Sequence, residues 1–361
     1  MPKTTTIIAV AVFSVAVGTL CVYFYWWAVS FYKRKTAEPP PAPLAPRKTL
    51  WRDPGEVEKL DFAGGRGGRD GVPRPPFRFV EEHIAGSSPC MSVRDARKRV
   101  WRIKWGDEVQ SETFASRVAW AAGYHVETNY YLPEGEIKGA KDLTRAKDCV
   151  GEDCRFRPAR FELDEPGVVK MFDEHGWAWD DNPFVGTREL AGLKIVFMLT
   201  SNWDNKDVRD VARGSNTAIF QHRLPDGRLE ARYLIIDWGA TMGRWAPVGF
   251  REKWDSEAYE AQTPEFVTGV REDGTVEWGY LGQRTEDATE GISVEDVRWL
   301  YRYVGRITDA QIRDGLRAAG STDDAEVERF TRALRERINQ LGRVAELGTA
   351  YRPPGKEEGA A

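Results

Sequence analysis

Four polar side chains within residues 199–244 have the types and the order that phosphoryl transfer requires. They are Asp204, Lys206, Asn216 and Asp237, and the last of them opens an Asp-Trp-Gly tripeptide. Phosphoryl transfer needs an Asp that orients the acceptor hydroxyl, and an Asn and an Asp that hold Mg²⁺ against the nucleotide phosphates. The order therefore predicts a catalytic Asp204 followed by two metal ligands, Asn216 and Asp237.

The residues around this set predict the elements that must position it. An apolar run at 187–200 has helical spacing and ends shortly before Asp204. Two short apolar runs, 217–222 and 232–236, are joined by a Pro-Asp-Gly turn, which is typical of a β-hairpin. The two predicted metal ligands then stand at the two ends of one hairpin. Either tripeptide alone is common in loops that bind nothing, so the prediction depends on the ordered set.

The N-terminal half offers a second pair of charged residues. Three short strands are predicted there, at residues 77–81, 91–94 and 100–105. Lys104 lies at the end of the third strand, and a predicted helix at 111–122 carries Glu112 in its first turn. If this helix packs behind the strand, Glu112 can pair with Lys104. Glu108 is the rival partner, but it is predicted to precede the helix.

Length and composition are consistent with a two-lobed globular body and additional segments. The chain has 361 residues, of which 41% are hydrophobic, and its net charge is −4. No part of the sequence is strongly basic, which argues against a nucleic-acid-binding protein.

The N-terminal region is predicted to be a transmembrane anchor. Residues 7–31 are almost entirely apolar, and about 25 helical residues span roughly 37 Å, enough for a bilayer core of about 30 Å. A secretory signal peptide is the alternative, but its apolar region is normally shorter and ends at a small-residue cleavage site. The basic cluster at 33–35 favours a cytoplasmic location for the bulk of the chain, and an extracytoplasmic location is the alternative.

Composition along the chain suggests five consecutive parts. They are a transmembrane anchor with its basic flank (1–35), a Pro/Gly-rich linker (36–76), an N-terminal lobe (77–132), a C-terminal lobe (133–350) and a disordered tail (351–361).

Two cysteines lie close together in the predicted C-terminal lobe. Cys149 and Cys154 can form a small disulfide loop or remain as two free thiols, depending on the compartment. A disulfide would favour a secreted or periplasmic protein.

Several segments of the chain resemble the protein-kinase-like superfamily, in one of its divergent branches. More narrowly, the chain is similar to a group of bacterial membrane-anchored or exported proteins with a kinase-like core. The segments that carry this resemblance lie within residues 77–341 and read VRDARKRVWRIKWG, SETFASRVAWAAGY, NPFVGTREL, NWDNKD and ITDAQIRDGLRAAG.

The resemblance implies an α+β fold, with a two-lobed protein-kinase-like domain behind a single N-terminal transmembrane helix. It also implies ATP and Mg²⁺ as cofactors and a hydroxyl group on a protein, lipid or small molecule as the acceptor. Lys104 would contact the nucleotide phosphates, and Glu112 would orient Lys104. Asp204 would orient the acceptor hydroxyl, and Lys206 would neutralise charge on the transferred group.

The chain also departs from the pattern of the superfamily. The candidate nucleotide loop, residues 86–89, has one glycine, and the interval between Asp204 and Asn216 is longer than usual. Trp238 stands at the middle position of the metal-binding tripeptide, where Phe is usual. These departures leave open a second function, a non-catalytic pseudokinase that serves as a membrane-tethered module for nucleotide binding or protein interaction.

Overall fold

Alternating apolar and charged residues build a seven-stranded sheet in the N-terminal part of the chain. The strands are antiparallel except for one parallel pair, β2 with β6, and their order is β5-β8-β4-β3-β2-β6-β7. The computed structural model describes residues 46–84, 88–171, 176–205, 216–246 and 248–353. The strand bounds are β2 (Phe77–His83), β3 (Cys90–Arg94), β4 (Val100–Lys104), β5 (Asn129–Leu132), β6 (Gly135–Lys138), β7 (Arg155–Phe156) and β8 (Ala159–Leu163).

One face of this sheet is apolar and the other is polar. Trp101 and Ile103 of β4 are fully buried in an apolar cluster with Phe77 and Phe161, because alternate residues of a strand point to opposite faces. The intervening residues of β4 therefore belong to the opposite face. Helix α2 (Val109–Ala121) follows β4, and its first residue lies within two positions of the helix start that the sequence predicts.

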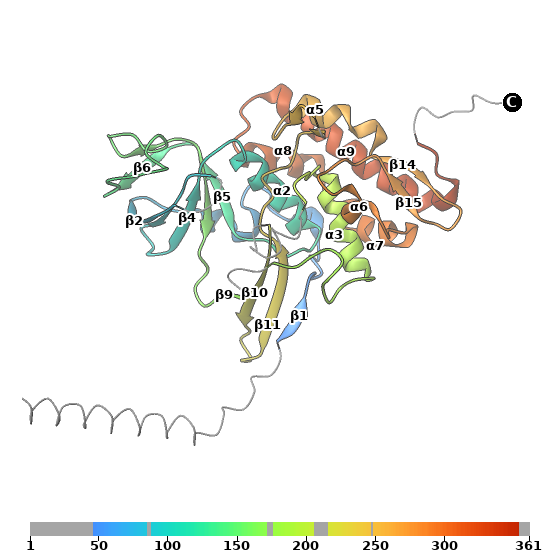
Figure 1. Ribbon diagram of the computed structural model, residues 1–361, viewed down its shortest axis with the longest axis horizontal. Helices are drawn as coiled ribbons and strands as arrows, with labels where there is room; N and C mark the ends of the chain where they lie inside the picture. The colour runs from blue at the N-terminus through green and yellow to red at the C-terminus, as the bar shows by residue number, and fades with distance from the viewer. Residues whose placement is uncertain (1–45, 85–87, 172–175, 206–215, 247, 354–361) are drawn as a thin grey trace, which may run out of the picture. The chain divides into compact units, whose positions relative to one another are not determined.

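A second, four-stranded sheet has the order β1-β11-β10-β9. Its strands are β1 (Arg47–Thr49), β9 (Val169–Met171), β10 (Thr217–Arg223) and β11 (Leu229–Ile235). Strands β10 and β11 form the predicted hairpin, with Thr217 opposite Ile235. Strand β1 runs parallel to β11 at the edge of the sheet. Within residues 46–361, Figure 1 shows this sheet below α2 and beside the seven-stranded sheet.

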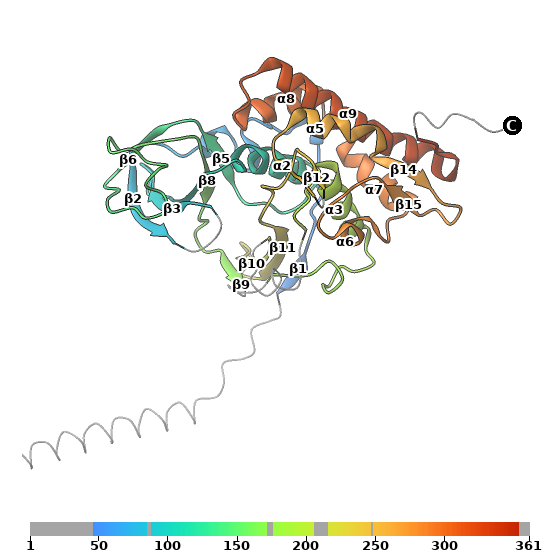
Figure 2. The ribbon, with the colours of Figure 1, turned by 45° about the horizontal axis from the view of Figure 1, so that its top comes forward.

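Helices make up most of the rest of the C-terminal part. They are α3 (Arg188–Leu199), α5 (Ser256–Ala261), α6 (Thr285–Thr289), α7 (Val294–Val304), α8 (Asp309–Ala318) and α9 (Asp324–Leu347), with 3₁₀ turns η1 (Val57–Lys59), η2 (Gly65–Gly67), η3 (Arg69–Gly71), η4 (Thr263–Glu265) and η5 (Gly348–Ala350). Two short hairpins complete it, β12 (Trp245–Ala246) with β13 (Phe250–Arg251), and β14 (Val267–Val270) with β15 (Val276–Trp278). Figure 2 shows α8 and α9 lying together on one side of this part.

The N-terminus of helix α8 is fixed by residues that the sequence places just before and just inside the helix. Thr308 and Gln311 form a capping box, in which each side chain satisfies a backbone group at the other position. Helices and strands both contribute to the described part of the chain, so the fold is mixed α/β, as expected.

Residues 46–76 were predicted to belong to a linker, but they are part of the folded body. Leu50, Val57 and Phe62 are buried in the same apolar core as helices α3, α7 and α9. Polar contacts add to this packing, since the amide nitrogen of the Gln311 side chain donates to the backbone carbonyls of Val57 and Leu60 at 2.8 Å each. Single, widely spaced apolar residues attach this segment to the core. Such residues are not recognisable as buried within a Pro/Gly-rich sequence.

The seven-stranded sheet also continues past residue 132, where the sequence analysis placed the end of the N-terminal lobe. Strand β8 lies between β5 and β4 in this sheet. It is the last strand of the sheet along the chain, and it ends at Leu163. At the other terminus, Tyr351 of the predicted tail is buried, and residues 354–361 lie outside the described residues.

The predicted membrane span at residues 7–31 also lies outside the described residues. Of the helices that the structure describes, none has the length and apolar character to cross a membrane. Cys149 and Cys154 are free thiols in the structure.

Candidate active site

The loop after α3 is bound to the segment after β11 through backbone hydrogen bonds. The amide of Trp203 donates to the carbonyl of Ala240 at 3.0 Å, and the amide of Met242 donates to the carbonyl of Thr200 at 2.8 Å. The buried Arg337 of α9 supports the start of this loop, because its guanidinium donates to the Ser201 hydroxyl at 2.7 Å. Two segments that are distant in sequence are therefore held side by side where Asp204 and Asp237 lie.

Asn202, Asp204, Asn216 and Asp237 form one hydrogen-bonded group. The fully buried Asn202 side chain accepts from the Asp204 amide at 3.3 Å and donates to the Asp237 carbonyl at 3.2 Å. The Asn216 side chain donates to the Asp204 carbonyl at 2.8 Å. The hairpin register adds a further link, since the Ile236 amide donates to the Asn216 carbonyl at 2.7 Å. The structure thus brings together three residues that the sequence analysis predicted at the site.

The carboxylate of Asp204 is held by a residue that the sequence analysis did not single out. The Gln283 side-chain amide donates to Asp204 Oδ1 at 2.9 Å. Gln283 lies in a loop, and its backbone amide donates to the backbone carbonyl of Trp203 at 3.0 Å. No local sequence pattern indicates this contact. Lys206, the other predicted catalytic residue, lies outside the described residues.

Lys104 faces the two acidic side chains that the sequence analysis considered as its partners. Its Nζ lies 3.5 Å from Glu108 Oε1 and 3.9 Å from Glu112 Oε2. The pKa of Lys104 is raised first by Glu112 and further by Asp237, although burial opposes this shift. Lys104 is therefore a permanent cation close to the predicted metal ligand Asp237.

Glu112 has a closer cationic partner than Lys104. Arg160 of β8 places Nη1 2.5 Å from Glu112 Oε1 and Nη2 2.8 Å from Glu162 Oε2. Burial raises the pKa of Glu112 to about 8, while Arg160 and Lys104 oppose the shift. Arg160 is thus the cationic partner of two buried carboxyl groups and favours their ionised forms. The sequence analysis missed it because the surrounding residues have the composition of a charged insertion.

The turn that carries Asp237 packs against the N-terminus of α2. The Ser111 hydroxyl donates to the Gly239 carbonyl at 2.7 Å, and the Gly239 amide donates to Asp237 Oδ1 at 2.9 Å. A Cβ atom at residue 239 would lie 2.8 Å from the Cβ of Glu108, which is too close for any side chain. Glycine at this position therefore allows the turn to approach the helix.

Lys253 is a second lysine at this junction. It lies after β13, and its Nζ is 3.2 Å from Glu108 Oε2. Burial opposes its charge, but Glu108 and Asp107 raise its pKa. Glu108 therefore lies between two lysines, and the hydroxyl of Ser88 also donates to it at 2.8 Å.

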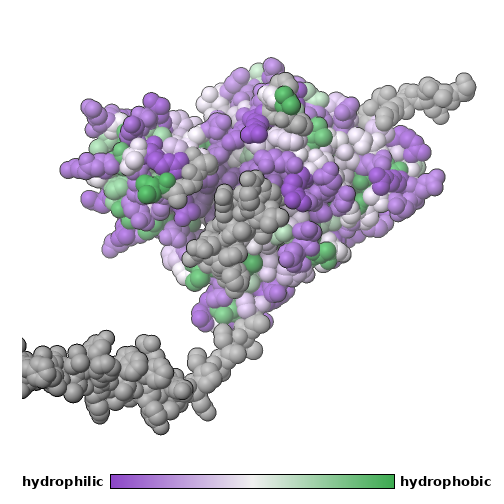
Figure 3. Space-filling view, in the orientation of Figure 1, coloured by the Kyte–Doolittle hydropathy of each residue, from purple (hydrophilic) through white to green (hydrophobic). Residues whose placement is uncertain are grey.

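A cavity of about 690 Å³ opens beside these groups. It is bounded by the polar face of the seven-stranded sheet on one side and by β10 and β11 on the other, and both Lys104 and Asp237 line it. This volume is in the range of small-molecule and cofactor sites. The face seen in Figure 3 is largely hydrophilic, with hydrophobic residues scattered singly over it.

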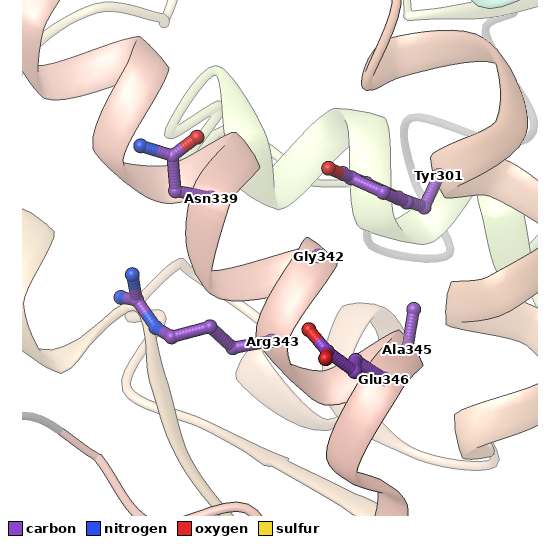
Figure 4. A pocket seen from close by; sticks show the side chains of 6 residues that line it. All are labelled: Tyr301, Asn339, Gly342, Arg343, Ala345 and Glu346. Atoms are coloured by element: carbon purple, nitrogen blue, oxygen red, sulfur yellow. The ribbon is translucent and has the colours of Figure 1, made fainter.

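A second hollow, of about 470 Å³, lies on the C-terminal helices. Figure 4 shows it between α7 and α9, with Tyr301 on one side and Arg343 and Glu346 on the other. None of the predicted site residues lines it, so it is separate from the candidate active site.

The donor set around Asp237 suits a hard cation. One carboxylate and one amide oxygen are ligands that Mg²⁺ accepts, since it usually keeps several waters and uses one or two protein carboxylates with phosphate oxygens. Within the ranges that the structure describes, no group of three His, Cys, Asp or Glu side chains is arranged to hold a metal ion.

Similar solved structures include kinases. The crystal structure of a Helicobacter pylori proinflammatory kinase, CtkA, aligns with 75% of this chain and 99% of its own, at 12% identity and a TM-score of 0.44. A Golgi casein kinase aligns with 83% of this chain and 80% of its own, at 9% identity and a TM-score of 0.35. The Golgi casein kinase with Mn/ADP bound gives 10% identity, the same coverages and a TM-score of 0.33.

Neither a protein-family model nor a curated protein matches the sequence. The roles of individual residues therefore rest on the contacts described above.

Proposed function

We propose that this protein is a Mg²⁺-ATP-dependent phosphotransferase that acts on a hydroxyl acceptor. The observation that carries the proposal is the hydrogen-bonded group of Asn202, Asp204, Asn216 and Asp237 at the edge of a cavity that Lys104 also lines. Phosphoryl transfer is catalysed mainly by positioning and by neutralising charge, and this group contains the residue types for both.

Each side chain has one task in this proposal. Bound Mg²⁺-ATP supplies the phosphoryl group that is transferred. Asp237 and Asn216 hold the metal, and Lys104 binds phosphate oxygens as a point charge. Asp204 orients the acceptor hydroxyl and accepts its proton, while Gln283 fixes the orientation of the Asp204 carboxylate.

The membrane anchor belongs to the same proposal. We propose that residues 7–31 hold the protein in a membrane with the catalytic part in the cytoplasm, where ATP is available. The apolar length of the segment and the basic cluster after it support this arrangement. Quantifying the thiols of Cys149 and Cys154 in protein isolated without reductant tests the location, because a disulfide between them would favour the extracytoplasmic alternative.

Nucleotide binding is the first test. Thermal unfolding of the full-length protein is followed with and without Mg²⁺-ATP, beside the variants Lys104→Met and Asp237→Asn. Ligand at a hundred times its dissociation constant adds about 2.7 kcal/mol of stability. We expect a Mg²⁺-dependent shift in the parent protein that both variants lose. Lys141→Met and Asp148→Asn are matched controls at exposed positions and should keep the shift.

A folded protein that shows no shift with Mg²⁺-ATP contradicts the proposal. A shift without phosphoryl transfer to any acceptor or to water would instead favour the non-catalytic pseudokinase.

A further inference from the structure

The residues on either side of Lys253 are bound to the two loops that carry the candidate active site. The indole of Trp203 donates to the backbone carbonyl of Glu252 at 3.0 Å. The backbone amide of Trp254 donates to the backbone carbonyl of Thr241 at 3.2 Å. Trp203 directly precedes the predicted catalytic residue, and Thr241 follows the metal-binding tripeptide. The backbone at Lys253 is therefore fixed relative to both loops.

Trp254 also attaches this segment to helix α2. Its ring packs against Phe330 of α9 with centroids 4.9 Å apart, and against Phe114 of α2 with centroids 6.2 Å apart. Both phenylalanines are fully buried. Because Lys253 directly precedes Trp254, this packing brings its side chain within reach of Glu108 at the start of the same helix.

The carboxylate of Glu108 binds groups outside the helix that it precedes. Its Oε1 accepts from the Ser88 hydroxyl at 2.8 Å and lies 3.5 Å from Lys104 Nζ. Its Oε2 lies 3.2 Å from Lys253 Nζ. The Glu108 side chain is 10% exposed, so water competes little with these contacts. One buried carboxylate is thus divided between a lysine of the seven-stranded sheet and a lysine of the C-terminal part.

The turn after Asp237 brings a second carboxylate close to Glu108. A Cβ atom at Gly239 would lie 3.1 Å from Glu108 Oε2 and 3.1 Å from Asp237 Oδ1, so both oxygens adjoin the same glycine. The two negative charges repel each other, because charges in a partly buried site are only weakly screened. If Lys253 is removed, Glu108 Oε2 is therefore driven away from Asp237 and towards Lys104, the cation that already contacts the other oxygen.

Lys104 cannot serve a carboxylate and a phosphate equally well. Its Nζ lies 3.5 Å from Glu108 and 3.9 Å from Glu112, both longer than the 3.2 Å between Lys253 and Glu108. These long contacts orient the ammonium group and leave it able to make the shorter, stronger bonds that an anionic ligand offers. Lys253 maintains this state, because it occupies the oxygen of Glu108 that would otherwise turn to Lys104.

We propose that Lys253 is a positioning residue, which acts through Glu108 to keep Lys104 available for the phosphate groups of a nucleotide. The inference rests on the proposed function, because it assumes that Lys104 binds phosphate oxygens. It assigns this role to a lysine that lies 145 residues beyond Glu108 in the sequence.

Binding of Mg²⁺-ATP to the full-length protein, measured by calorimetric titration, is the first test. Lys253→Met should bind roughly tenfold more weakly than the parent protein, a change that corresponds to one hydrogen bond to a charged group. Lys253→Arg keeps the positive charge beside Glu108 and should restore most of the affinity. Lys194→Met is the matched control, because Lys194 is also half-buried and donates to the Glu290 carbonyl at 3.1 Å, and it should bind ATP as the parent does.

A second variant tests the route through Glu108. Glu108→Gln removes the negative charge that competes for Lys104, so adding Lys253→Met to this variant should not weaken ATP binding further. The double variant should therefore bind ATP more tightly than Lys253→Met alone. A purely structural role for Lys253 predicts the opposite, since the double variant would lack both partners of the ion pair. Thermal unfolding without nucleotide records the structural contribution of each change separately.

Each outcome has a distinct meaning. Equal affinities of the parent protein and Lys253→Met for Mg²⁺-ATP overturn the inference and leave the proposed function intact. A loss of affinity that is equally large in the Glu108→Gln background also overturns it, because Lys253 would then act by another route. If Mg²⁺-ATP does not bind to the folded parent protein, the inference and the proposed function both fail.

Discussion

Replacing Arg160 by Met should strongly destabilise the protein at neutral pH. The guanidinium lies 2.5 Å from Glu112 and 2.8 Å from Glu162, and its side chain is 3% exposed. Met fills much of the same volume but removes the positive charge that stabilises the ionised forms of these two buried carboxyl groups. Removing one partner of a buried ion pair typically costs about 3–5 kcal/mol, because the remaining charge is left uncompensated.

The cost should depend on pH in a defined direction. Arg160 lowers the pKa of Glu162 in the parent protein, so this contribution to stability is present above the unfolded pKa and is lost as pH falls. Without Arg160 the buried carboxyl groups become protonated, which costs little at pH 5 and more at pH 8. The difference in unfolding free energy between parent and variant should therefore grow as the pH rises.

Urea denaturation at pH 5 and pH 7.5 measures this difference, and a variant too unstable at neutral pH can still be studied at the lower value. Arg157→Met is the matched control, because Arg157 is an exposed residue near the start of the same strand, and it should change stability by less than about 0.5 kcal/mol. The reasoning is refuted if Arg160→Met loses less than about 1 kcal/mol at pH 7.5, or loses the same amount at both pH values.

Three further predictions concern single residues of the site. The Asp204→Asn variant should fold normally and have a turnover lower by about 10²–10⁴-fold, the range for losing a positioned acid/base group. In a phosphotransferase assay, a turnover near that of the parent protein would exclude this role for Asp204. The Glu112→Gln variant should gain stability relative to the parent protein as pH rises from 5 to 8, by on the order of 1 kcal/mol per pH unit. The pKa of Glu112 is raised to about 8 in the folded protein, so the parent loses stability over this range while the uncharged Gln does not. Equal pH profiles in urea denaturation would contradict it. Arg337→Met should cost about 1–3 kcal/mol, since it removes the buried donor to the Ser201 hydroxyl, while the carbonyl of Leu199 keeps the Tyr259 hydroxyl as a donor. Unchanged thermal stability would show that the Ser201 hydroxyl finds another partner.

Strands and helices that carry the site could be predicted because their patterns are local. Lys104 lies at the end of a strand whose alternation of Trp101, Arg102 and Ile103 is visible in the sequence. The ends of α3 and β10 were expected within one residue of their observed positions, since apolar spacing and turn residues mark them, whereas β11 begins at Leu229 and not at residue 232. The types and order of Asp204, Asn216 and Asp237 were likewise enough to nominate them.

Arg160, Lys253 and Gln283 could not be nominated in this way. Arg160 reaches Glu112 because β8 enters the sheet between β5 and β4, and this strand order is not encoded in any short pattern. Lys253 and Gln283 lie in loops whose contacts depend on the packing of distant helices. The role of residues 46–76 was missed for the same reason, because a few anchoring side chains secure an otherwise polar segment.

The sequence by itself determined the local elements, the position of Lys104 at a strand end and the set of residue types that phosphoryl transfer uses. Hydrophobic periodicity and turn chemistry act over a few residues, so a single sequence displays them directly. Only the tertiary structure decided which charges meet, as in the contacts of Arg160 with Glu112 and Glu162. Such contacts depend on strand order and on which faces pack together, and burial then sets the protonation of the groups that meet.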